Sequence, residues 1–122
     1  MKSDDFKSRL IKRAYNYSLD IIKFIDLLDK KDFTTQIIAK QLIRSATSVG
    51  ANIVEAQAAS SRKDFTNFLN HSLRSANESK FWLGLLRDSA KTPKAGVNLL
   101  LQETDELAKI LGSSIMTLRG KK

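Results

Sequence analysis

Residues 10–28 read LIKRAYNYSLDIIKFIDLL, and their apolar side chains recur at alternating steps of four and three residues. The recurring positions are Leu10, Ala14, Tyr17, Ile21, Phe24 and Leu28. A helix with about 3.6 residues per turn brings such positions onto one face. The stretch therefore predicts a long amphipathic helix that buries this face.

Three later segments show the same spacing, from Ile38 to Ala56, from Phe65 to Ala90 and from Val97 to Leu118. No segment alternates between apolar and polar residues as a strand would. We expect helices at about 4–30, 33–59, 62–90 and 93–118. Because the connections are short, neighbouring helices should run antiparallel. The sequence thus predicts an all-α, up-down-up-down four-helix bundle that forms a single domain over residues 1–122.

Residue types at the expected helix ends agree with these boundaries. Asp32 is suited to cap the second helix, and Ser61 followed by Asp64 approximates a capping box for the third. Thr92 precedes Pro93, an arrangement that favours Thr92 as the cap of the fourth helix and proline as its first residue.

Composition excludes several protein classes. The chain has 122 residues, of which 42% are hydrophobic, so it can form one core. The chain has only five glycines and one proline, which is too few for a turn-rich β-sandwich or barrel. The absence of cysteine excludes a disulfide framework and a thiolate metal site, and it fits a reducing compartment. No leader-like or membrane-spanning apolar run is visible, so we expect a cytoplasmic protein with no membrane partner.

The core-facing positions of the last three helices include small hydroxylated residues. They are Ser45, Ser72, Ser79, Thr104 and Ser114. Their hydroxyls can bond to the carbonyl four residues earlier, which allows close helix packing. The alternative is a polar seam that is buried against another subunit.

The residue types that known catalytic, metal and cofactor sites require are missing from the sequence, so we expect none of these sites. His71 is the only histidine, and Phe68 stands where a di-metal bundle would place a glutamate. We expect His71 to be a surface or half-buried helix residue. No glycine-rich phosphate loop is present. Glu55 and Glu78 could be imagined as an acid/base pair, but nothing supplies a nucleophile.

A polar strip on the second helix has a simpler explanation. Its residues are Arg44, Ser48, Asn52 and Glu55, which fall within roughly 80° on a helical wheel. Together they donate and accept hydrogen bonds. With Glu78 they are predicted to organise the packing of helices or of subunits.

Residues 41–55, QLIRSATSVGANIVE, resemble the signature of the 23S rRNA-intervening-sequence protein family. A second similar run contains Phe65 and Glu78. Two departures are the alanine at position 56, where the family usually has glycine, and Arg74, where it usually has a small residue.

The resemblance implies a bacterial, cytosolic four-helix bundle. Members of this family resemble the accessory variability determinant proteins of diversity-generating retroelements. Those are basic pentameric bundles that bind nucleic acid and a reverse transcriptase. The resemblance therefore implies a homopentamer with a nucleic-acid-binding or protein-docking role.

Basic residues are concentrated at one end of the predicted bundle. The net charge is +8, and the end that holds both termini and the second turn carries ten basic and four acidic residues, or +6. The opposite end carries +2. The candidate nucleic-acid-binding residues are Lys7, Arg9, Lys12, Arg13, Arg62, Lys63, Arg119, Lys121 and Lys122. A solvated surface is the other interpretation of this charge.

We therefore predict a non-enzymatic, oligomeric bundle that binds nucleic acid, specifically RNA, through backbone charge. The alternative is a protein-interaction scaffold that docks a partner such as a reverse transcriptase. Tyr15, Phe81 and Trp82 are candidates for a second surface, because adjacent aromatics cannot both point into one core.

Overall fold

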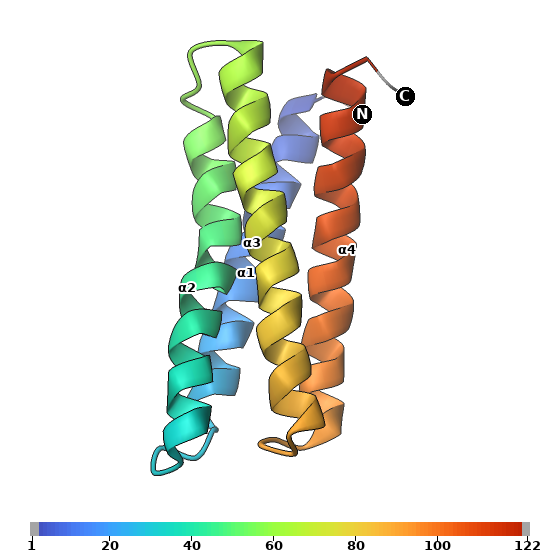
Figure 1. Ribbon diagram of the computed structural model, residues 1–122. Helices are drawn as coiled ribbons and strands as arrows, with labels where there is room; N and C mark the ends of the chain where they lie inside the picture. Colours follow the sequence, from blue (N-terminus) through green and yellow to red (C-terminus); the bar gives the residue numbers. More distant parts are fainter. Residues whose placement is uncertain (1–2, 121–122) are drawn as a thin grey trace.

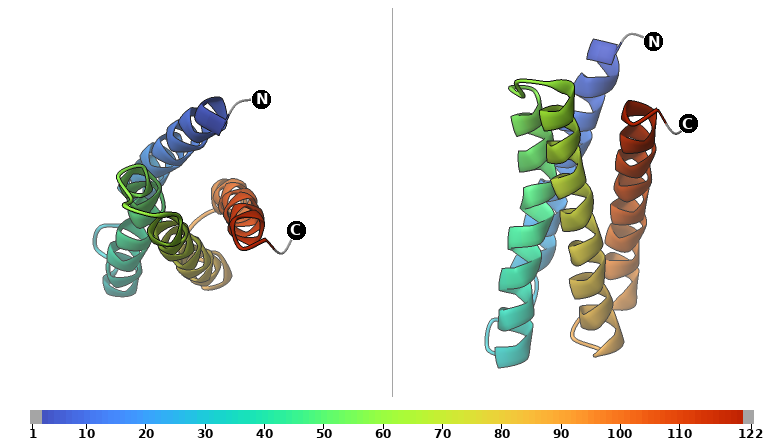
Figure 2. Two further views of the ribbon diagram at one scale, coloured as in Figure 1. Left: turned by 90° about the horizontal axis from the view of Figure 1, so that it is seen from above. Right: turned by 45° about the horizontal axis from the view of Figure 1, so that its top comes forward.

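The computed structural model describes residues 3–120, with side chains from Asp5 onward. Four helices form within this range, and no strand. They are α1 (Ser3–Asp26), α2 (Phe33–Ala56), α3 (Arg62–Asp88) and α4 (Lys94–Leu118). Helices that follow one another pack side by side and antiparallel, and α4 returns beside α1 (Figures 1 and 2). The predicted all-α, up-down-up-down bundle is confirmed.

The heptad positions form the core, as predicted. Tyr17, Ile21 and Leu107 are at most 1% exposed, and the remaining core residues come from all four helices. Gly50 of α2 lies close to α1, since a Cβ atom at position 50 would be 3.4 Å from that of Ala14. This pair of small residues allows the two helices to approach each other at this point.

Three predicted helix ends were too long. Beyond Asp26 and Ala56 the backbone makes i→i−3 bonds, such as Leu27 N–H to the Phe24 carbonyl, which are typical of a tightened last turn. Beyond Asp88 the backbone of Ala90 is left-handed, with φ of 59°. The N–H groups of residues 90 and 91 bond back to the carbonyls of residues 87 and 86, which closes a Schellman motif.

Two of the three predicted caps are confirmed. The Asp32 carboxylate accepts the Thr35 N–H at 3.0 Å, and the Thr35 hydroxyl and N–H together lower the pKa of Asp32 to about 2. Ser61 Oγ accepts the Asp64 N–H at 3.0 Å. The Thr92 prediction was wrong, because Pro93 is the N-cap residue and offers no side-chain hydrogen bond, so α4 begins at Lys94.

Candidate nucleic-acid interface

The predicted basic residues meet at one end of the bundle. The start of α1, the α2–α3 turn and the end of α4 share this end (Figure 1). The basic end is defined here by its described residues Lys7, Arg9, Lys12, Arg13, Arg62, Lys63 and Arg119. Lys121 and Lys122, also predicted for the site, lie outside the described residues.

Three of these cations surround one hollow of about 500 Å³. Arg62 and Lys63 come from the first turn of α3, and Arg119 follows α4. Thr66, Asn67 and Leu118 complete the lining, and no acidic side chain of the described chain contributes to it. A hollow with this lining attracts anions and offers hydrogen-bond donors to them.

The Arg62 guanidinium is held in place by the end of α4. Its Nε and Nη2 atoms donate to the Leu118 carbonyl oxygen at 3.1 and 2.9 Å. A cation at a helix C-terminus is favoured by the unpaired carbonyl groups there. This contact connects α3 to α4 and fixes the position of one cation of the hollow.

The other cations of the basic end differ in the contacts that their side chains make. The Lys7 ammonium lies 5.1 Å from the centre of the Phe65 ring, in a cation–π contact. Lys12, Lys63 and Arg119 are exposed, and their side chains make no ion pair within the described chain. These three side chains can reach a ligand without breaking an existing salt bridge.

Arg13 was predicted to bind nucleic acid, but its side chain is engaged in ion pairs between α1 and α4. Its Nε and Nη2 atoms donate to the two carboxylate oxygens of Glu103 at 2.7 Å, and Nη2 also donates to Glu106 at 2.9 Å. These hydrogen bonds raise the pKa of Arg13 above its already high ordinary value. Together the three groups carry a net charge of −1, so Arg13 adds no cationic field to the basic end. It connects α1 to α4.

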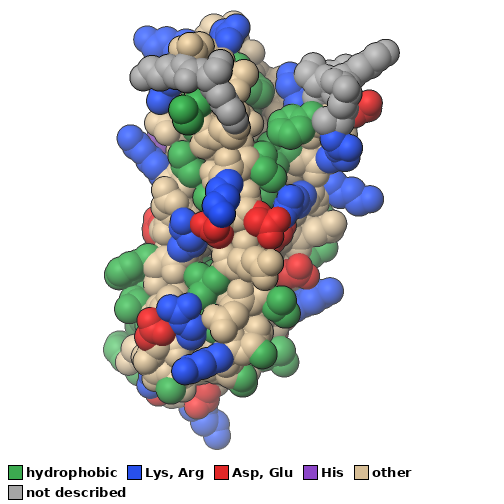
Figure 3. Space-filling model, turned by 90° about the vertical axis from the view of Figure 1, so that its right-hand side faces the viewer, with side chains coloured by type: hydrophobic (Ala, Val, Ile, Leu, Met, Phe, Trp, Pro, Cys, Tyr) green, Lys and Arg blue, Asp and Glu red, His purple; other side chains and the backbone are tan. Residues whose placement is uncertain are grey.

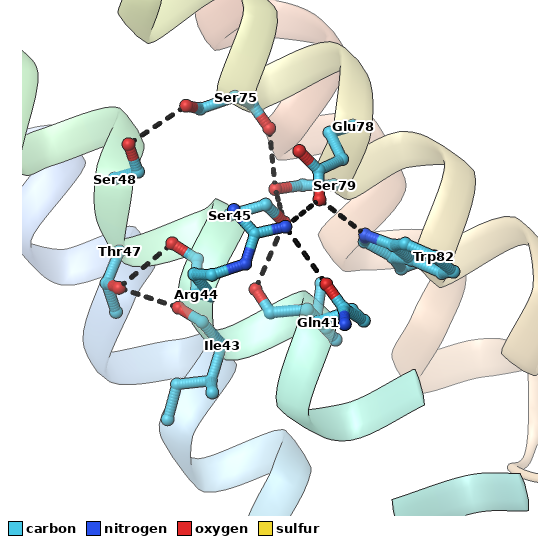
Figure 4. A network of polar contacts seen from close by, with 11 residues as sticks. Gln41, Ile43, Arg44, Ser45, Thr47, Ser48, Ser75, Glu78, Ser79 and Trp82 are labelled. Atoms are coloured by element: carbon cyan, nitrogen blue, oxygen red, sulfur yellow. Dashed lines mark hydrogen bonds and ion pairs between the residues drawn. The ribbon is translucent and has the colours of Figure 1, made fainter. Parts of the chain in front are cut away.

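Part of the predicted polar strip connects α2 to α3 (Figure 4). Arg44 Nη2 donates to Glu78 Oε2 at 2.5 Å and to Gln41 Oε1 at 2.9 Å. Trp82 Nε1 donates to the same Glu78 oxygen at 2.9 Å. The network holds Trp82, which is half-buried, against the core. Gln41 and Trp82 were not predicted to join it.

The hydroxyl groups of the α2–α3 interface form a second set of contacts. Ser75 Oγ donates to Ser48 Oγ at 2.9 Å, and Asn52 Nδ2 donates to the backbone carbonyl and the hydroxyl of Ser48. Ser45 and Ser79 share a hydrogen bond of 2.8 Å.

The other core-facing hydroxyl groups also make hydrogen bonds within the chain. Ser72 donates to the Val49 carbonyl at 2.7 Å, and Thr104 Oγ1 lies 2.6 Å from the Tyr17 hydroxyl. Ser114 donates to the Ile110 carbonyl. These bonds match the interpretation of tight helix packing with satisfied hydroxyl groups.

Glu55 lies apart from the rest of the strip. Its carboxylate is exposed and makes no hydrogen bond or ion pair within the described chain. It borders a hollow of about 410 Å³ between α1 and α2, whose apolar lining includes Ile11, Tyr15 and Val54. Tyr15 is 65% exposed and Val54 53% exposed. We call this surface the α1–α2 face.

His71 is exposed on α3, as the sequence predicted. Among the described residues, no three histidine or acidic side chains gather as metal ligands. No helix in the described part of the chain has the length and apolar character needed to cross a bilayer.

Four antiparallel helices with an excess of basic over acidic residues at one end define a basic helical-bundle protein. The family model for the 23S rRNA-intervening sequence protein matches residues 7–113, and the chain belongs to this family.

The chain is also similar to a solved structure from Bacteroides thetaiotaomicron VPI-5482, described as a protein with unknown function from the S23 ribosomal protein family. The two share 34% sequence identity with a TM-score of 0.81, over 87% of this chain and 97% of the other. No match was found among curated proteins.

Proposed function

We propose that this protein is a non-enzymatic, cytoplasmic RNA-binding bundle that contacts phosphates through its basic end. The observation that carries the proposal is the hollow lined by Arg62, Lys63 and Arg119, to which no acidic side chain of the described residues contributes. Lys12 adds an exposed cation from α1 at the same end. Phosphate oxygens bind arginine and lysine side chains in this arrangement, and each contact releases a condensed counterion.

Recognition of the backbone is favoured over recognition of bases. Base-reading proteins for single strands stack bases on exposed aromatic rings. At the basic end, Phe65 is half-buried with Lys7 over its ring, and Phe6 is only 37% exposed, so the described residues offer no row of freely exposed rings there. We therefore expect binding with little dependence on RNA sequence.

A matched pair of triple variants tests the proposal. Lys12→Gln, Lys63→Gln and Arg119→Gln remove three exposed cations from the basic end. Lys23→Gln, Lys31→Gln and Lys94→Gln remove three exposed cations from the other half of the bundle. Affinity for labelled single-stranded RNA is measured by fluorescence anisotropy over a series of salt concentrations.

The wild type should show a log–log salt slope of about −0.7 for each phosphate contacted. The basic-end variant should lose up to about 2 from the magnitude of that slope and bind unrelated sequences equally weakly. The control variant should lose much less. Equal losses in the two variants would mean that total charge governs binding. If the wild type fails to bind even at low salt, the alternative of a scaffold that docks a protein such as a reverse transcriptase is favoured.

We also propose that the chain forms a homo-oligomer through the α1–α2 face. Large exposed apolar side chains beside a hollow are typical of an interaction surface. The unpaired carboxylate of Glu55 could accept a hydrogen bond from a neighbouring copy there. Sequence resemblance implies a pentamer as the assembly.

Native mass spectrometry tests the assembly. Tyr15→Asp or Val54→Asp should shift micromolar protein to the monomer mass, because each places a charge in the proposed interface. Leu99→Asp is the control, since Leu99 is 70% exposed but lies on α4. A wild-type protein that is already monomeric would contradict this proposal and leave RNA binding to be judged separately.

A further inference from the structure

A second, larger hollow opens at the basic end between α1 and α4. Its volume is about 580 Å³, within the range of small-molecule sites in proteins. All four helices contribute side chains, which are mainly apolar: Phe6, Leu10, Ile53, Phe65, Leu69, Ile110 and Leu118. Figure 3 views the molecule from this side and shows hydrophobic side chains at the surface near this end of the bundle, beside Lys and Arg side chains. We call this hollow the terminal pocket.

The pocket exists because α1 and α4 diverge toward this end. Of the neighbouring helix pairs, α1 and α4 contact each other least (Figure 2). The hydrogen bonds between them lie near mid-bundle, where Arg13 binds Glu103 and Tyr17 meets Thr104. Beyond this point toward the basic end, Phe6 is 37% exposed at the pocket. The opening therefore leads directly from solvent to buried Leu10 and Leu69.

The dimensions of the pocket fit a slender occupant. Its α4 lining extends from Lys109 to Leu118 along one helix face, a length of about 14 Å. An extended alkyl chain fills such a slot with about eleven carbons at ~1.3 Å each.

The charged groups of the pocket have one sign. Lys7 of α1 and Lys109 of α4 belong to the lining, and no acidic residue of the described chain does. Lys109 is exposed and pairs only with Asp105 on its own helix, at 3.1 Å. Surface pairs of this kind are weak, so Lys109 can exchange partners at little cost. An anionic headgroup would find two cations where the alkyl chain leaves the pocket.

We propose that the terminal pocket binds a medium-chain alkyl carboxylate, with the chain between α1 and α4 and the carboxylate beside Lys7 and Lys109. This ligand class combines the two features of the pocket, an apolar slot and a cationic rim. The binding site is separate from the hollow of Arg62, Lys63 and Arg119, and the inference does not depend on RNA binding.

A chain-length series tests the slot. Saturated carboxylates compete with the fluorescent probe anilinonaphthalene sulfonate for the full-length protein. Affinity should rise about fourfold for each added methylene and stop rising near eleven carbons, where the slot is full. Dodecanol, which lacks the charge, should bind about tenfold more weakly than dodecanoate.

Two variants test the apolar lining of the pocket and the charge of its lysines separately. Ser114→Phe fills the pocket and should weaken dodecanoate binding at least tenfold, whereas Asn98→Phe, exposed on the same helix, should have no effect. Lys109→Gln should weaken dodecanoate but not dodecanol. Because Lys109 is outside the basic end, Lys109→Gln should leave RNA binding unchanged.

Three results would overturn the proposal. The first is the absence of saturable dodecanoate binding below its micelle concentration. The second is equal affinity for dodecanoate and dodecanol. The third is a change of native mass in Ser114→Phe, which would show that a second copy of the chain occupies the pocket. Circular dichroism establishes that each variant is folded.

Discussion

Leu107→Ala is expected to lower the free energy of unfolding by about 2–5 kcal/mol. Leu107 is 0% exposed and belongs to the core of the bundle. Truncation removes its apolar contacts and leaves a cavity that surrounding helices fill only in part. Small domains have a total stability of about 5–15 kcal/mol, so this loss is a large part of it.

The matched control is Leu99→Ala on the same helix. Leu99 is 70% exposed, and the same truncation there should change stability by less than about 0.5 kcal/mol. Urea unfolding followed by circular dichroism measures both variants. Similar losses in the two would show that the face of α4 assigned to the core is wrong.

Alkaline pH is expected to destabilise the bundle through one tyrosine. Burial raises the pKa of Tyr17 to about 12, from an ordinary value of 10.0. As the pH rises above 10, the unfolded chain loses this proton while the native chain retains it. The stabilisation is complete below pH 10, and about 2–3 kcal/mol of it should be lost by pH 12.

Tyr17→Phe isolates this effect. Near neutral pH the variant should be less stable by about 1 kcal/mol, because the hydrogen bond with Thr104 is lost. At about pH 12 it should equal or exceed the wild type, since phenylalanine does not ionise. A constant difference between the two proteins over this pH range would contradict the assignment. In Tyr15→Phe, phenolate absorbance reports the ionisation of Tyr17 alone.

Much of the fold could be predicted because its determinants are local. Heptad spacing depends on residues three and four apart, and it indicated the buried positions Tyr17, Ile21 and Leu107. The cap formed by Asp32 was likewise readable from the neighbouring residues. The end of α3 was not, because a left-handed alanine at position 90 gives no sequence signal of the kind that glycine gives.

The candidate site was less predictable because its contacts are distant in sequence. Topology alone brought Arg62 and Arg119 to one end of the bundle. It could not show that Arg13 would turn toward Glu103, 90 residues away, or that Arg62 would bond to a backbone carbonyl. The terminal pocket depends on how α1 and α4 diverge, and residue periodicity carries no information about that angle.

The thin contact between α1 and α4 has a consequence for the order of folding. Every other neighbouring helix pair is joined by a short turn, whereas the contact of Arg13 with Glu103 between α1 and α4 closes a loop of 90 residues. Loop closure of that length costs more entropy than pairing across a turn, and few contacts compensate for it. We therefore expect the contact between α1 and α4 to form last during folding. Because α1 also packs less extensively on its neighbours than the other helices do, its backbone amides should exchange with solvent first.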